Sequence, residues 1–62
     1  MTIRLVKAGP GIYAVTLDGQ PMGSISRERR GRHHTWKATG IQGRETLIPD
    51  RDAAARWVAR TP

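Results

Sequence analysis

The sequence contains no cysteine, no phenylalanine and only three aromatic residues among its 62 positions. The lack of cysteine excludes a disulfide framework and the common cysteine-based zinc sites. A chain of this length buries only about 60% of the surface that its unfolded form exposes, so its stability is marginal. We therefore expect a single domain over residues 1–62 with a small apolar core, to which homodimer formation would add stability.

Long apolar runs are missing as well. No stretch of the sequence approaches the roughly 20 residues of a membrane-spanning helix, and none resembles the apolar segment of a secretory signal. We therefore expect a soluble, cytoplasmic protein without a membrane partner.

Acidic residues are scarce, because only five stand against eleven Lys and Arg, which gives a formal net charge of +6. Nine of the eleven cations are arginine, whose guanidinium group binds phosphate bidentately and stacks on bases. A GC-rich genome would favour arginine over lysine, but it would not produce an excess of cations over anions. The sequence pI near 11.5 makes a polyanion the first expected partner.

Glycine and proline divide the first four-fifths of the chain into segments of strand length. These segments lie at residues 2–7, 12–17, 22–28, 34–39 and 44–48. Turn residues at this spacing predict an antiparallel meander of three to five strands.

Alternation within the segments predicts which side chains face the core. The bulky residues Tyr13, Val15 and Leu17 point one way, and Ile25 continues this pattern in the next segment. For Val15 and Ile25 to share a face, the loop at Asp18-Gly19 needs an odd number of residues. We predict a loop of three or five residues, with Gly19 at positive φ.

The final segment predicts a helix over about residues 50–60. Asp50 is a suitable N-cap, and Arg56 and Arg60 lie toward the negative end of the helix dipole. A helical wheel places Ala53, Ala54, Trp57 and Val58 on one side and Asp52, Arg56 and Ala59 roughly opposite. The expected core is Tyr13, Val15, Leu17, Ile25, Trp36, Leu47, Ala54, Trp57 and Val58, joined by Ile3 and Leu5 if the first segment pairs. The fold class is thus α+β, a small antiparallel β-meander with one C-terminal helix packed on one face.

The densest charge lies around the turn between the third and fourth predicted strands. Residues 27–37 carry five cations against one acid, and Gly31 allows a tight turn. A solubility device would normally mix charges of both signs, so contact with nucleic acid is the favoured interpretation. A two-stranded ribbon with a basic tip fits a major groove, while an arginine loop can enter a narrow minor groove.

The sheet face opposite the helix is the second candidate surface. It would present Thr16, Ser24, Ser26, Thr35, Lys37 and Thr39, whose hydroxyl and ammonium groups can donate to phosphates and base edges. Threonine is also simply a good strand former. Together the two surfaces give the candidate DNA-binding residues Ser24, Ser26, Arg27, Arg29, Arg30, Arg32, His33, His34, Thr35 and Lys37.

Metal binding and catalysis find little support in the sequence. His33 and His34 are adjacent, so a strand would point them to opposite faces and they could not chelate one metal together. No nucleophile elbow and no glycine-rich phosphate loop is visible. We expect no enzyme activity, no cofactor and no bound metal, and we expect Trp36 to be buried rather than stacked on a base.

Three stretches, "YAVTLDG", "GSISRERRGRHHTWKA" and "RDAAARW", resemble in their order the small DNA-binding domains built from a three-stranded sheet and a helix. These are the AP2-type domains and the N-terminal arm-binding domains of tyrosine integrases. The resemblance covers roughly residues 12–58 and implies that the sheet lies in the major groove. Carried over, it gives DNA contacts to Ser24, Ser26, Arg27, Arg29, Arg30, Arg32, Thr35 and Lys37. The concentration of cations at the loop favours phosphate binding over base-specific reading.

The sequence therefore predicts a small, nucleoid-associated protein of a bacterium or phage that binds double-stranded DNA as a transcriptional or recombination accessory factor. The alternative is a protein-interaction module that binds an acidic partner, or dimerises, through its sheet. RNA binding through unpaired bases ranks lower, because it needs exposed aromatic residues.

Overall fold

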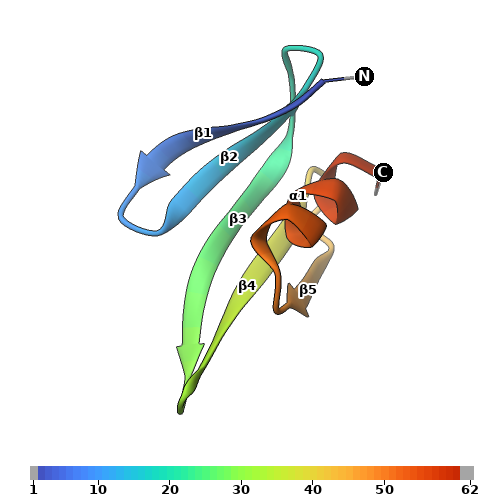
Figure 1. The fold of residues 1–62 in the computed structure, drawn as a ribbon. Helices are drawn as coiled ribbons and strands as arrows, with labels where there is room; N and C mark the ends of the chain where they lie inside the picture. Colours follow the sequence, from blue (N-terminus) through green and yellow to red (C-terminus); the bar gives the residue numbers. More distant parts are fainter. Residues whose placement is uncertain (1, 61–62) are drawn as a thin grey trace.

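The computed structural model describes residues 2–60, except for the side chain of Arg30. Five strands form one open antiparallel sheet in sequential order, and a helix follows them (Figure 1). The elements are β1 (Ile3–Gly9), β2 (Ile12–Leu17), β3 (Gln20–Arg30), β4 (His33–Gly40), β5 (Glu45–Ile48) and α1 (Arg51–Arg60). The expected α+β meander with a C-terminal helix is confirmed. In the part of the chain that the structure describes, no helix is long and apolar enough to cross a membrane.

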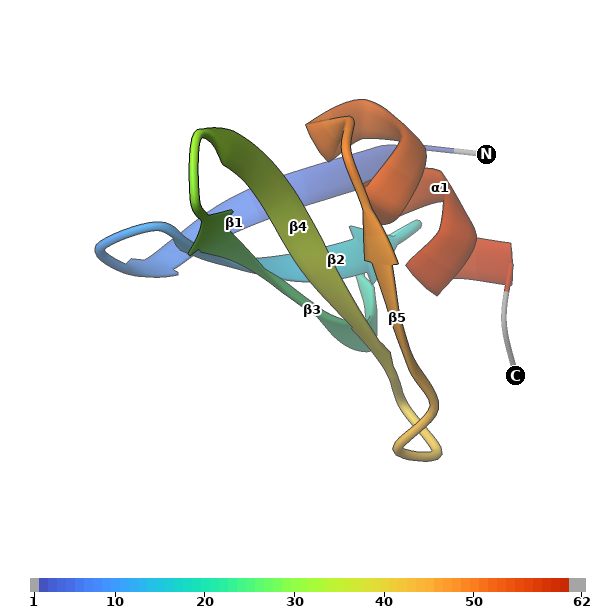
Figure 2. The ribbon, with the colours of Figure 1, turned by 90° about the horizontal axis from the view of Figure 1, so that it is seen from below.

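Helix α1 packs on one face of the sheet, mainly against β3 and β4 (Figures 1 and 2). It begins as predicted, because the Asp50 Oδ2 atom accepts a hydrogen bond of 2.9 Å from the backbone N–H of Ala53. Asp50 thus satisfies one of the free amides at the helix start. The buried core beneath the helix consists of Val15, Ile25, Ala38, Ala54, Ala55 and Val58.

The buried side of α1 is rotated from the one that the helical wheel predicted. Its buried residues are Ala54, Ala55, Val58 and Ala59, so the placement of Ala59 opposite the core was wrong. Trp57, expected in the core, is only half-buried and packs at the rim of the core, whereas Val58 is fully buried. The alanine side of the helix contacts the sheet because its small side chains allow the closest approach.

The residue that β5 contributes to the core also differs from the prediction. Ile48 lies opposite Trp36 and packs against the core, whereas Leu47 lies opposite Lys37 and is 41% exposed. Paired residues of an antiparallel sheet project from the same face. Leu47 therefore belongs to the face that carries Lys37, which we call the open face because α1 does not cover it.

Val15 and Ile25 lie on the same face of the sheet, but not because of an odd-numbered loop between β2 and β3. Leu17 pairs with Gln20, so the loop contains only Asp18 and Gly19, and the predicted odd-numbered loop was wrong. Both loop residues have positive φ, 50° and 84°, as a type I′ turn requires; for Gly19 this was predicted. The extra residue lies instead in β3, where the register shifts between Thr16, opposite Pro21, and Val15, opposite Gly23. This β-bulge places Ile25 on the same face as Val15.

Helix and sheet approach each other closely at Gly23. Its φ is 145°, and a Cβ atom added there would overlap the carbonyl oxygen of Thr39 and lie 2.8 Å from Cγ1 of Val58. Glycine is therefore the only residue type that fits at position 23. The bulge thus also delivers a glycine to the point where α1 meets β3.

Candidate nucleic-acid interface

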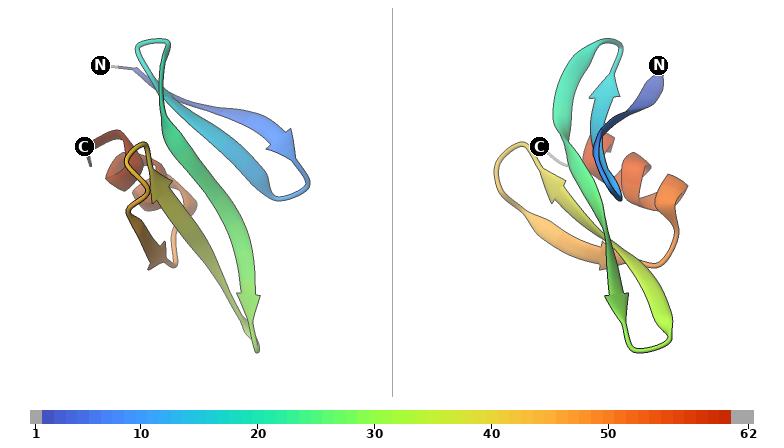
Figure 3. Two further views of the ribbon diagram at one scale, coloured as in Figure 1. Left: turned by 180° about the vertical axis from the view of Figure 1, so that it is seen from behind. Right: turned by 90° about the vertical axis from the view of Figure 1, so that its left-hand side faces the viewer.

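The β3–β4 hairpin extends beyond the rest of the molecule as a two-stranded ribbon (Figures 1 and 3). We call residues 27–36 the basic ribbon. Its cross-strand pairs are Arg27 with Trp36, Glu28 with Thr35, Arg29 with His34 and Arg30 with His33. Gly31 has a φ of 61° at the tip, which gives the predicted tight turn. Four arginines and one glutamate give the ten residues a net charge of +3.

The pairing register distributes the ribbon's side chains over two faces. Arg27 and Arg29 follow the buried Ile25 at two-residue steps, so they share the helix side of the sheet with His34 and Trp36. Glu28, His33 and Thr35 occupy the open face. The register thus places the two histidines on opposite faces, as predicted. Arg27, Arg29, Arg32, His33 and His34 are exposed, whereas the side chain of Arg30 lies outside the described part of the structure.

On the helix side, Arg27 and Arg29 lie next to a rim formed by two aromatic rings. The rings of Tyr13 and Trp36 are 5.9 Å apart at their centroids with a tilt of 48°, and both are half-buried. The guanidinium carbon of Arg51 lies 5.9 Å from the centroid of Tyr13, within the range of a cation–π interaction. Trp36 was expected to be buried, and it instead forms the partly exposed edge between the core and the ribbon.

Arg27 is held in place at the base of the ribbon. Its backbone N–H donates a 2.8 Å hydrogen bond to the carbonyl of Gly11. A Cβ atom at Gly11 would come within 3.4 Å of the Arg27 Cβ and 3.6 Å of its Nε. The guanidinium stem therefore lies over the turn between β1 and β2, and Gly11, with a φ of 68°, leaves room for it.

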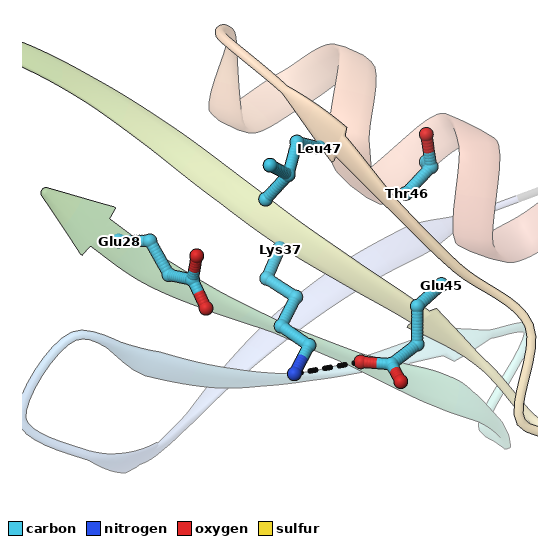
Figure 4. Close-up of a pocket in the computed structure, with 5 residues that line it drawn as sticks. All are labelled: Glu28, Lys37, Glu45, Thr46 and Leu47. Carbon is cyan, nitrogen blue, oxygen red and sulfur yellow. Dashed lines mark ion pairs between the residues drawn. The ribbon is translucent and has the colours of Figure 1, made fainter. Parts of the chain in front are cut away.

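The open face next to the ribbon has a different charge pattern. Glu28, Lys37, Glu45, Thr46 and Leu47 line a shallow hollow of about 290 Å³ (Figure 4). Lys37 Nζ lies 2.7 Å from Glu45 Oε2. The hydrogen bond from Lys37 to Glu45 and the charge of Glu45, with a smaller contribution from Glu28, raise the pKa of Lys37. Lys37 is thus occupied by a carboxylate of its own chain.

Strand-borne charge is therefore segregated between the two faces. Among the described side chains, the open face carries Arg4 and Lys37 against Glu28 and Glu45, so these charges cancel. The helix side of the strands carries Lys7, Arg27 and Arg29, and no acid among the residues whose side chains the structure describes. The cationic surface is thus the helix side of the ribbon and its tip, including Arg32.

The predicted hydroxyl residues lie on the open face, as expected. Ser24 pairs with Thr39, Ser26 with Lys37, and all four are half-buried. The Thr35 Oγ1 donates a 3.3 Å hydrogen bond to the carbonyl of Glu28, so one hydroxyl already has a partner within the ribbon. Val6, Ile12 and Leu47 are exposed on the same face.

The sequence prediction missed two cations of the helix side, Lys7 and Arg51. Lys7 lies opposite Tyr13 in the β1–β2 register, and Arg51 lies over the ring of Tyr13. Only the register and the helix position bring them near the ribbon, although the alternation of β1 with Leu5 would have placed Lys7 on the helix side.

Within the described residues, no three His, Cys, Asp or Glu side chains are close enough together to hold a metal ion. No protein-family model, no curated protein and no solved structure matches this chain. The resemblance to AP2-type and integrase arm-binding domains stays a prediction.

Proposed function

We propose that the protein binds double-stranded DNA through the basic ribbon, with phosphate contacts from Arg27, Arg29 and Arg32. The observation that carries this proposal is the projection of exposed arginines on a free hairpin. Within the described part of the chain, none of these three guanidinium groups has an ion-pair partner. Their hydrogen-bond donors are therefore available to a polyanion.

The dimensions of the ribbon support a groove contact. Two paired strands lie about 5 Å apart, and the major groove is roughly 12 Å wide, so it admits a two-stranded ribbon. The molecule measures 35 Å along its longest axis. A ribbon inserted by its tip would bring Arg29 and Arg32 to the phosphates, while Arg27 and Arg51 near the aromatic rim would face the groove edge.

The charges of the described side chains on the open face cancel, which favours the ribbon over the sheet face as the principal contact. Glu28 and Glu45 would approach the phosphates if the sheet lay flat on DNA, and like charges would repel one another. If the tip enters the groove, Ser24, Ser26 and Lys37 contact DNA only at the margin of the interface. This arrangement favours phosphate binding with weak dependence on base sequence.

Fluorescence anisotropy with labelled duplex DNA across a salt series tests the proposal. The variant Arg29→Gln/Arg32→Gln should bind more weakly. The plot of log K against log salt should become less steep by about two, because each phosphate contact contributes about 0.9 to the magnitude of its slope. The control Arg4→Gln/Arg44→Gln removes the same charge away from the ribbon and should keep the slope. Equal losses in both variants would show that only the total charge matters and would refute the ribbon as the binding element.

A further inference from the structure

A continuous groove runs between the edge strand β1 and helix α1. One part of it, about 350 Å³, is lined by Ile3, Leu5, Asp52, Ala55 and Arg56. The next part, about 410 Å³, is lined by Ile3, Leu17, Arg56, Ala59 and Arg60. The two parts share Ile3 and Arg56, and each reaches the size of a ligand site.

The groove exists because the helix packs toward the other strands. Helix α1 contacts mainly β3 and β4, so β1 is only lightly covered. The flank of α1 above β1 presents the small side chains of Ala55 and Ala59, and Ile3 remains 38% exposed. The apolar part of the lining comes from β1, β2 and the alanines of α1, and the charged part consists of Asp52, Arg56 and Arg60.

The outer edge of β1 is free to accept another strand. Among residues 2–60, β1 pairs only with β2. The hydrogen bond from the Asp18 N–H to the Thr2 carbonyl fixes the alternation, so the backbone groups of Ile3, Leu5 and Lys7 point away from β2. The side chains of these three residues lie on the helix side, next to the groove. An added strand would thus form main-chain hydrogen bonds while placing alternate side chains in the groove.

Charge decides which strand fits this edge. Arg4, Lys7, Arg56 and Arg60 stand against Asp52, so the edge and the groove wall carry a net charge of +3. A second copy of the chain would bring its own +3 to the same place, and the two edges would repel each other. A strand with acidic side chains is complementary to the four cations.

We propose that the β1–α1 groove binds an extended, acidic segment of a partner protein as a sixth strand. Apolar side chains of the segment would lie on Ile3, Leu5 and Ala55, and its carboxylates would pair with Arg56 and Arg60. The segment adds parallel or antiparallel to β1, and its specificity comes from the side chains that enter the groove. The inference is independent of the DNA-binding function, because it uses a different edge of the molecule.

A designed peptide titration followed by two-dimensional 1H–15N NMR tests this proposal. The probe is a seven-residue, capped peptide with leucine at positions 3 and 5 and glutamate elsewhere. It should shift the amides of Ile3, Leu5 and Ala55 saturably. The same peptide with lysine in place of glutamate should not bind, and N-methylation of alternate backbone amides should abolish binding, since it blocks strand pairing.

Protein variants complete the test. Arg56→Gln/Arg60→Gln should weaken the acidic peptide about fivefold or more, as expected for two exposed ion pairs. Arg29→Gln/Arg32→Gln removes the same charge from the ribbon and should leave the affinity unchanged. Equal binding of the lysine peptide, shifts confined to the ribbon, or concentration-dependent shifts of β1 without any peptide would each overturn the proposal. The last result would identify a second copy as the occupant.

Discussion

Replacing Gly23 with alanine should strongly destabilise the protein. The added Cβ would overlap the Thr39 carbonyl oxygen and lie 2.8 Å from Val58 Cγ1. A φ of 145° is nearly confined to glycine, and a side chain there costs about 1–3 kcal/mol. Overpacking of a tight core adds about 1–3 kcal/mol.

The combined loss of about 2–6 kcal/mol is large for this chain. At about 0.05–0.15 kcal/mol per residue, a domain of 62 residues has a free energy of unfolding of about 3–9 kcal/mol. Gly23→Ala should therefore lower the urea midpoint steeply or leave the protein unfolded at 25 °C. Far-UV circular dichroism during urea titration measures both outcomes.

Gly43→Ala provides the matched control for this experiment. Gly43 also has positive φ, 87°, but an added Cβ would meet no atom within 4 Å. This variant carries a backbone cost without any new contact, so a larger loss in Gly23→Ala reflects the contact with β4 and α1 together with the more restrictive φ of Gly23. If Gly23→Ala were no more destabilising than Gly43→Ala, the close approach of helix and sheet at Gly23 would be refuted.

Three further predictions address the cap, the ion pair and the bulge. Asp50→Ala should lower the free energy of unfolding by about 1 kcal/mol, because the Ala53 amide loses its acceptor; unchanged thermal unfolding would contradict this role. Glu45→Gln should lower the pKa of Lys37, since the anion that stabilises the ammonium form is removed; NMR titration of the lysine side chain checks the direction. Stability from this pair is present below the unfolded-state pKa of lysine and is lost as pH rises through the raised folded-state pKa. Deletion of Met22, the extra residue of the bulge, would leave Thr16 opposite Pro21 and Val15 opposite Gly23 in a regular ladder, with Ile25 still opposite Tyr13, so the native circular dichroism spectrum should be retained; an unfolded spectrum would contradict this assignment of the bulge.

Local sequence signals predicted the elements correctly, and the features they missed depend on long-range pairing. The glycine and proline punctuation located all five strands, and Asp50 marked the helix start. Alternation also showed that one extra residue was needed between Val15 and Ile25. It could not show whether that residue lies in the loop or in a strand. Pro21, which lacks an N–H for the ladder, is a sequence signal for the bulge in β3.

The remaining differences have the same cause. Leu47 and Ile48 are adjacent and similarly apolar, so only the pairing of Ile48 with Trp36 decides which one enters the core. Four alanines in α1 made two sides of the wheel nearly equivalent, and contact with the sheet selected between them. The arginine content of the ribbon was visible in the sequence, whereas the neutralisation of Lys37 by Glu45 depends on the β4–β5 register.

The register also separates the two proposed binding sites along the sheet. Ile3, in the groove, pairs with Leu17 at one end of β2, whereas Arg27 bonds to Gly11, next to the other end. Five residues of extended β2 span roughly 17 Å, and perturbations at that separation without shared partners add independently. The groove variant Arg56→Gln/Arg60→Gln should therefore weaken peptide binding. Its salt slope for DNA binding should change no more than that of Arg4→Gln/Arg44→Gln, which removes the same charge. Because Arg4→Gln/Arg44→Gln measures the global effect of charge, a larger change in the groove variant would mean that DNA also contacts Arg56 and Arg60, and the two sites would then have to be treated as one continuous cationic surface.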